Sequence, residues 1–222
     1  EYVWIYGEQC RWWGPRRDLP NTAGQGRLWE EAMPGITRVI AYTRNPLAAA
    51  KAELAELRKS AQLTNLAKNA DFRQAASPPA GSMPAEFGAW QDEGNPTGKF
   101  AWDAEAGEGS GRATKVKWGC FIQGLAVRTG EEYAVEVSCR PQGSSQPTLV
   151  IRWQTAESRW TQEHLDQTFP FEPGDGQWQK AFGVVTVPEG VGRLIVLLNV
   201  TGQSSDDDTC WFDNLGVYRL RP

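Results

Sequence analysis

The chain has 222 residues, of which 40% are hydrophobic, and it contains 11 tryptophans. This composition predicts a globular protein with a substantial core, built as one large domain or as one domain with an appendage. The formal net charge of -4, without a basic segment, argues against nucleic acid as a partner. No apolar run approaches the roughly 20 residues of a membrane helix, so no membrane partner is expected. The single histidine, His164, argues against a His-rich zinc site and a His-based catalytic triad.

The first 44 residues predict a strand, a loop and a helix. The apolar run YVWIY at 2–6 is typical of a buried strand, residues 14–26 are rich in Gly, Pro and Arg, and residues 27–42 have apolar side chains at helical spacing. One such unit cannot complete a parallel sheet or barrel by itself. We therefore interpret residues 1–44 as the C-terminal remnant of an upstream domain. The alternative is that strand 2–6 pairs with the sheets formed later in the chain.

Residues 45–64 predict a linker helix. Asn45 is a favourable N-cap, and Pro46 suits the first helical position. Apolar side chains then recur at steps of three and four residues, at Leu47, Ala50, Leu54, Leu57 and Ala61. A stripe of this kind is expected to pack on a surface, either on the remnant or jointly on the remnant and the following domain. A flexible linker would instead be rich in Gly, Ser or Pro.

Residues 65–222 predict an antiparallel β-sandwich. The hydrophobic period changes to two, as in residues 133–139 and 149–153, and turn signals such as 129–130, 141–143 and 188–190 separate the runs. About eight to ten short strands without helices are typical of a sandwich. The predicted fold class is therefore mainly β, with the strand–loop–helix remnant and the linker helix in front of the sandwich.

Four segments in this order resemble carbohydrate-binding modules of the family four, nine and twenty-two type. They are NLAKNADF at 65–72, FIQGLAVRTGEEYAVEVSCR at 121–140, GQWQKAFGVVTVPEGVGRLIVLLNV at 176–200 and CWFDNLGVYRL at 210–220. The resemblance implies a jelly roll appended to a glycoside hydrolase. Residues 1–44 resemble the end of a (β/α)8 glycoside hydrolase barrel, with YVWIYGE as its last strand.

The resemblance implies non-catalytic polysaccharide binding that targets an attached glycoside hydrolase to its substrate, in an extracellular or periplasmic setting. The expected partners are a polysaccharide or oligosaccharide and the upstream catalytic domain. Glu8 follows the presumed barrel strand, where active-site carboxylates lie, but it lacks a second carboxylate, so this chain is expected to be non-catalytic while its parent is an enzyme. The alternative function is a structural sandwich that braces the catalytic domain without binding sugar.

Sugars are bound by aromatic faces and by planar polar side chains. Trp90, Trp102, Trp118 and Trp160 have polar neighbours and are candidates for stacking, whereas Trp153 and Trp178 are expected in the core. The polar face of one strand carries Arg152 and Gln154, and that of the preceding strand carries Glu136, Ser138 and Arg140. If those strands are neighbours in a sheet, these side chains form a platform for hydroxyl groups. The alternative is an ordinary solvated sheet face.

Modules of this type often hold a structural calcium ion through an acidic residue after the opening Phe and an Asp of the closing strand. Here Arg73 follows Phe72, whereas Asp213 is retained. Because calcium prefers several oxygen ligands, Arg73 opposes the ion and could pair with Asp213 instead. The acidic loop at 204–210 is either a solvated turn or an ion site. The four cysteines are either buried thiols or include one disulfide.

Overall fold

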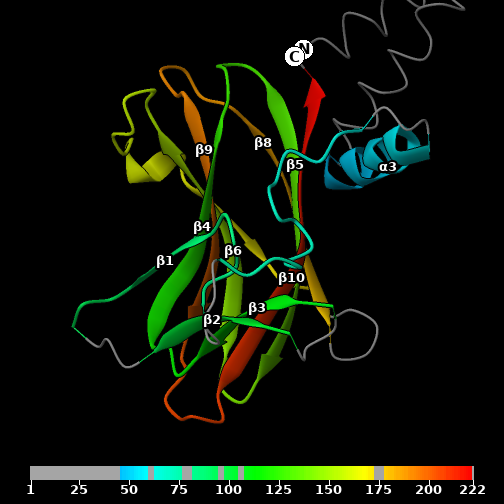
Figure 1. Cartoon of the computed structure of the whole chain (residues 1–222). Helices are drawn as coiled ribbons and strands as arrows, with labels where there is room; N and C mark the ends of the chain where they lie inside the picture. The colour runs from blue at the N-terminus through cyan, green and yellow to red at the C-terminus, as the bar shows by residue number, and fades with distance from the viewer. Residues whose placement is uncertain are drawn as a thin grey trace, which may run out of the picture. The chain divides into compact units, whose positions relative to one another are not determined.

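The computed structural model describes residues 46–59, 63–76, 82–94, 98–104, 108–172 and 178–221 (Figure 1). The predicted strand–loop–helix remnant, with Glu8 and the first cysteine, lies outside the described residues. The chain divides into two compact units, residues 1–60 and residues 61–222. None of the helices in the described part of the chain is long and apolar enough to cross a membrane.

Helix α3 in the first unit spans Pro46–Lys59. It begins at the proline that the sequence placed in the first turn, because a proline there has no backbone N–H to leave unpaired. Ala50 and Leu54 of the predicted stripe are buried, whereas Leu47 is exposed. Arg58 and Lys59 stand in the last turn, where positive charge is favourable at the helix dipole. The surface on which this helix packs stays a prediction.

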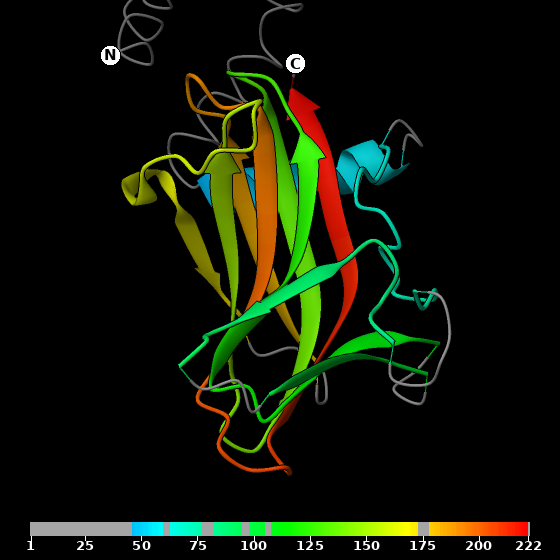
Figure 2. The ribbon, with the colours of Figure 1, turned by 60° about the vertical axis from the view of Figure 1, so that its left-hand side comes forward.

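The second unit is an antiparallel β-sandwich, as the sequence predicted (Figures 1 and 2). Its described residues form ten strands in two five-stranded sheets. The first sheet has the order β1-β4-β9-β6-β7, with bounds Gly88–Gln91, Trp118–Ala126, Arg193–Thr201, Gln146–Gln154 and Gln167–Pro170. The second sheet has the order β2-β3-β10-β5-β8, with bounds Lys99–Asp103, Ser110–Thr114, Thr209–Arg221, Glu132–Gln142 and Gln179–Thr186. A short 3-10 helix, η1 (Glu163–Leu165), precedes β7.

The core lies between the two sheets. Successive side chains of a strand point to opposite faces, so the apolar alternation read from the sequence becomes the inner surface of each sheet. Leu149, Ile151 and Trp153 of β6 are fully buried in it, which confirms Trp153 as a core residue. Burying each such side chain stabilises the fold by about 1.5–3 kcal/mol.

Aromatic rings join the two sheets at one end of the core. Phe72 stacks on Phe87 at a centroid distance of 4.4 Å, and Phe121 meets Phe212 edge to face at 6.1 Å. Gly111 of β3 makes room for them, because a Cβ there would lie 2.8 Å from the Phe72 ring. Phe72 belongs to the segment before β1, so this ring packing holds that segment against the sandwich.

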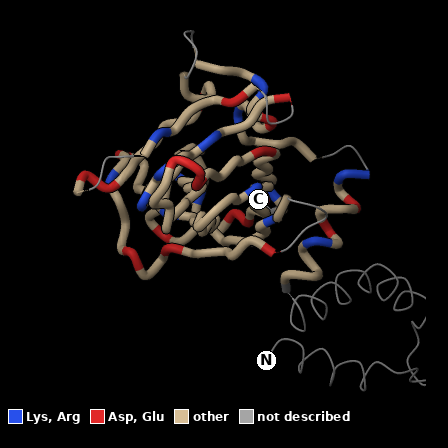
Figure 3. The backbone as a smooth tube through the Cα atoms, turned by 90° about the horizontal axis from the view of Figure 1, so that it is seen from below, with Lys and Arg blue, Asp and Glu red and all other residues tan. Residues whose placement is uncertain are grey.

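The segment before β1 is tied to the closing strand. The Asn65 side chain donates to the carbonyl oxygen of Leu215 at 2.9 Å and accepts the backbone N–H of Val217 at 2.9 Å. Gln123 of β4 is buried and bonds both backbone groups of Lys68. Charged residues of both signs are interspersed along the backbone (Figure 3). Together with backbone bonds from the Leu66 N–H to the Val217 carbonyl oxygen and from the Leu215 N–H to the Ala70 carbonyl oxygen, these side-chain bonds hold the segment on β10.

Candidate functional site

The outer face of the first sheet is the candidate site. Its floor follows from strand register: Phe121, Leu198 and Leu149 point into the core, so their neighbours along each strand point outward. One outward row consists of Trp90, Cys120, Asn199 and Thr148, which are directly paired across β1, β4, β9 and β6. Further rows pair Trp118 with Thr201, Ile195 with Arg152 and Arg193 with Gln154.

Two exposed indoles stand at one end of this face. The side chains of Trp90 and Trp118 are 42% and 52% exposed, and their rings meet edge to face at a centroid distance of 5.4 Å. The two strands approach closely because Gly119 has no side chain; a Cβ there would lie 2.6 Å from the Trp90 carbonyl oxygen. The pair is therefore a built aromatic corner rather than two isolated surface residues.

A third exposed indole marks the other end of the face. Trp160 is 50% exposed and lies in the loop after β6, where it bridges to Gln154. The Arg152 guanidinium stacks over the Trp160 ring at 4.6 Å, and its Nε donates to Asp166 at 2.8 Å. Asp166 follows η1, so this short helix positions the carboxylate that orients the arginine. Arg152 and Trp160 thus form a fixed cation–aromatic pair.

Arg193 is a site residue that sequence reasoning missed. It lies on the outer face beside Gln154, and its guanidinium reaches across Gly124, where a Cβ would lie 3.0 Å from an arginine nitrogen. Its Nε is buried and has no hydrogen-bond partner within the described part of the chain. A buried donor without a partner is uncommon in folded proteins. The outward position of Arg193 at the start of an apolar strand was the available signal.

The floor between the two ends is largely uncharged. Cys120 is a buried free thiol beneath the aromatic corner, and burial raises its pKa to about 12, so it stays protonated. Asn199 donates to the Thr148 hydroxyl at 3.1 Å. Trp118 shares its row with Gln146 of β6, six residues before Arg152 on the same strand. At a rise of about 3.3 Å per residue, the six residues from Gln146 to Arg152 span about 20 Å along the strand. The two ends of the face are therefore farther apart than the length of a single sugar ring.

The other predicted binding residues do not join this face. Trp102 is half-buried, and its indole N–H donates to the Phe72 carbonyl oxygen at 2.6 Å, so it anchors the opening segment. The predicted platform does not form, because β5 and β6 belong to different sheets. Glu136 and Arg140 lie on the outer face of the second sheet, opposite Arg152 and Gln154. The strands β5 and β6 are consecutive in the sequence, but the chain crosses from one sheet to the other between them.

The prediction that Trp178 belongs to the core is wrong. Its side chain is half-buried, and the Arg140 guanidinium lies over its ring at 5.5 Å. The same guanidinium lies 4.2 Å from the Trp211 ring. Arg140 is therefore flanked by two indoles on the outer face of the second sheet. A tryptophan before an alternating strand does not reveal on which face it will lie.

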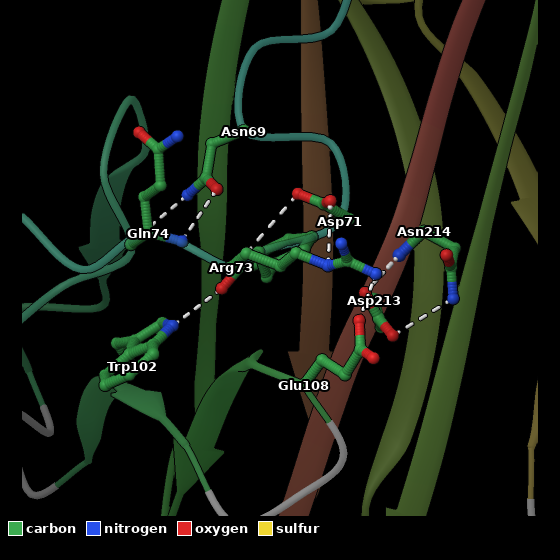
Figure 4. Close-up of polar contacts among 9 residues, drawn as sticks. Asn69, Asp71, Arg73, Gln74, Trp102, Glu108, Asp213 and Asn214 are labelled. Atoms are coloured by element: carbon green, nitrogen blue, oxygen red, sulfur yellow. Dashed lines mark hydrogen bonds and ion pairs between the residues drawn. The ribbon is translucent and has the colours of Figure 1, made fainter.

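The residues that the family resemblance assigns to calcium form a cluster around Arg73 (Figure 4). Arg73 pairs with Asp71 at 3.1 Å and with Glu108. The pairing of Arg73 with Asp213 that the sequence suggested is not the one that forms. Asp213 accepts the backbone N–H of Asn214 at 2.7 Å. Burial, together with the nearby carboxylates of Asp71 and Glu108, raises the pKa of Asp213 to about 6.

This cluster does not suit a calcium ion. A guanidinium already supplies positive charge among the carboxylates, and calcium requires six to eight oxygen ligands. Within the described ranges, no group of three or more His, Cys, Asp or Glu side chains is arranged to hold a metal.

Asp208 gives the acidic loop at 204–210 a structural role. Its carboxylate accepts backbone N–H groups from Ser144, Ser204 and Ser205 at 2.7–2.8 Å. These three bonds hold the pKa of Asp208 well below its ordinary value. The carboxylate thereby joins the β5–β6 turn to the β9–β10 loop. The cysteines that the structure describes, Cys120, Cys139 and Cys210, are buried free thiols.

Neither a family model nor a curated protein sequence matches this chain. Among solved structures, the chain is similar to a family four carbohydrate-binding module (17% identity, TM-score 0.46, covering 68% of this chain and 98% of that one). It is also similar to the CBM22-1 xylan-binding domain from Paenibacillus barcinonensis Xyn10C (12% identity, TM-score 0.43, covering 66% and 99%). A third is the bacteriophage CBA120 tailspike protein 4 enzymatically active domain (12% identity, TM-score 0.45, covering 70% of this chain and 21% of that one).

Proposed function

We propose that the outer face of the first sheet binds a polysaccharide or oligosaccharide. One observation carries the proposal: of the tryptophans in the described part of the chain, the three exposed ones all lie on this face or at its rim. Exposed aromatic side chains gathered on one face, among a few oriented polar groups, mark a binding surface rather than a solvated one. The resemblance carried by the sequence points to the same class of ligand.

Each part of the face has a role in this proposal. Trp90 and Trp118 offer indole surface to the apolar C–H side of a pyranose ring. Arg152 and Arg193 donate hydrogen bonds to hydroxyl groups, and Gln154 both donates and accepts. Because the two ends are separated along the strands, the face suits a chain of sugars.

The biological setting extends this proposal. The binding face would hold an attached glycoside hydrolase on its polysaccharide, outside the cell or in the periplasm, with this chain making no catalytic contribution. Residues 1–44 carry the sequence resemblance to such an enzyme. A purely structural sandwich would have no need to expose three indoles on one face, so binding is the stronger proposal.

Titration calorimetry with a panel of β-glucans, xylans and β-galactans tests binding. We expect heat with at least one neutral polysaccharide, and a loss of about tenfold or more in affinity for Trp118→Ala. Trp178→Ala on the opposite sheet is the matched control and should keep the wild-type affinity. Absence of binding to the whole panel, or equal losses in the two variants, would overturn the proposal.

A further inference from the structure

A cavity lies on the outer face of the second sheet, opposite the face proposed above. Its volume is about 570 Å³, within the range of ordinary small-molecule sites. Strands β2, β3 and β10 and the loop before β10 build it, and its polar lining consists of Lys99, Arg112, Thr114, Lys115, Asp206, Thr209 and Trp211. It shares no residue with the face proposed above, because the core separates the two sheets.

Strand register explains how these side chains converge. Lys99, Thr114 and Thr209 are paired across the three strands, and Ala101, Arg112 and Trp211 form the next outward row. The residues between these rows, Ala113 and Cys210, belong to the core, so both rows face outward. Ala101 is the small member of its row. Its methyl group leaves the space that longer side chains surround.

The cavity carries an excess of positive charge. Arg112 pairs with Asp103, whose side chain is 10% exposed, and the same carboxylate oxygen accepts the indole N–H of Trp211 at 2.9 Å. Lys115 pairs with Asp206 at 3.2 Å, but that carboxylate is 85% exposed and strongly solvated. Within the described ranges, no carboxylate forms an ion pair with Lys99. Lys99 therefore adds a positive charge that no carboxylate of the described residues pairs, beside an Arg112 guanidinium that is 44% exposed.

Asp103 also orients two of the side chains that line the cavity, Arg112 and Trp211. Because one oxygen holds both the Arg112 guanidinium and the Trp211 indole, the cation and the ring are fixed beside each other. Arg112 uses one of its five N–H donors for this bond, which leaves others for a ligand. Guanidinium and ammonium groups bind carboxylate and sulfate oxygens by strong charge-assisted hydrogen bonds.

We propose that this cavity binds an acidic sugar residue, one that carries a carboxylate or a sulfate ester. Lys99 and Arg112 hold the anionic group, Trp211 contacts the C–H surface of the ring, and the Thr114 and Thr209 hydroxyls bond the sugar hydroxyls. The chain then has two sites of different charge preference on opposite sheets. One takes neutral sugars, and the other takes charged residues of a mixed or acidic polysaccharide.

Calorimetry with trigalacturonate, a sulfated disaccharide and neutral cellotriose tests the second site on the full chain. Lys99→Glu reverses the charge in the cavity. Lys180→Glu is the matched control, because Lys180 is exposed on the outer face of β8, with three strands between it and β2. That separation is about 19 Å, well beyond the Debye length of about 8 Å at physiological ionic strength. Lys99→Ala removes the charge without reversing it and serves if Lys99→Glu does not fold.

We expect an acidic ligand to bind the wild-type protein and to bind Lys99→Glu about tenfold or more weakly, while Lys180→Glu changes the affinity by about twofold or less. Binding of trigalacturonate alone identifies a uronate site, and binding of the sulfated sugar alone identifies a sulfate site. Trp118→Ala should leave acidic-sugar binding intact, so this site is judged separately from the neutral one. No binding by either acidic ligand, or equal losses in Lys99→Glu and Lys180→Glu, would overturn the inference.

Discussion

The indole rings of Trp90 and Trp118 meet edge to face, with an interplanar angle of 85° and a centroid distance of 5.4 Å. Aromatic pairs favour this geometry because the positive edge of one ring faces the negative face of the other. The contact packs each ring against the other on the surface. The two tryptophans come from β1 and β4, which are neighbours in the sheet although β2 and β3 separate them in the sequence.

This contact predicts that the two tryptophans act as a unit in binding. Trp90→Ala and Trp118→Ala should each weaken binding of a neutral polysaccharide, and the double variant should lose less binding free energy than the sum of the single losses. Side chains in contact commonly couple by about 0.5–3 kcal/mol. A double-mutant cycle by calorimetry measures the coupling. Additive losses would show that the rings contribute independently, against this prediction.

Replacement of Arg193 should separate binding from stability. Arg193→Met removes a buried donor that has no partner, so the free energy of unfolding should stay the same or rise, while affinity for the neutral polysaccharide falls. Arg128→Met, at an exposed turn, is the control and should change neither quantity. Urea unfolding and calorimetry supply the two measurements. A clear loss of stability in Arg193→Met would instead assign this arginine to the fold.

The raised pKa of Asp213 predicts a pH-dependent contribution to stability. The folded protein retains this proton up to about pH 6, whereas an unfolded Asp releases it near its ordinary pKa of 3.8. The contribution of Asp213 to stability is therefore fully present below pH 3.8 and is lost as the pH rises towards 6. Asp213→Asn lacks this titration. The stability of Asp213→Asn relative to wild type should grow between pH 4 and pH 6, as measured by urea unfolding; a constant difference would contradict the assignment.

The hydrogen bonds of Asp208 to Ser144, Ser204 and Ser205 leave no room for a side chain at Gly143. Gly143 has a φ of +67°, and a Cβ there would collide with the Asp208 carboxylate. Gly130 has a φ of +86° with open space around it, so it is the matched control. Gly130→Ala should cost about 1–2 kcal/mol from backbone strain alone, and Gly143→Ala should cost more. Thermal unfolding measures the loss of stability in each variant. Equal losses would contradict the prediction, because they would mean that the Asp208 hydrogen bonds tolerate a methyl group at position 143.

The Arg73 cluster predicts that the wild-type protein does not depend on calcium. Arg73 supplies the positive charge among Asp71, Glu108 and Asp213, so added calcium should not raise the melting temperature and a chelator should not lower it. Calcium that binds only the folded state would raise the melting temperature by mass action. A calcium-dependent increase in the wild-type protein would therefore contradict the interpretation of this cluster.

The local pattern of the sequence was sufficient to predict the β-strands of the sandwich and the inner face of several of them. The alternation around Leu149, Ile151 and Trp153 predicted an inner face, because side chains on a strand alternate whatever the strand pairs with. Pro46 likewise marked the start of α3, because its effect on a helix is local. Three of the four proposed stacking tryptophans are exposed, and their polar neighbours were the signal.

Sheet membership was decided only by the tertiary structure. Arg152 and Arg140 come from consecutive strands, yet β6 lies between β9 and β7 while β5 lies between β10 and β8. Strand order depends on pairing between distant segments, which no window of local sequence contains. The sequence by itself therefore determined the alternation of side chains within a strand. Only the folding of the two sheets decided that Arg193 joins Arg152 on one face, and that Arg112 and Trp211 meet on the other.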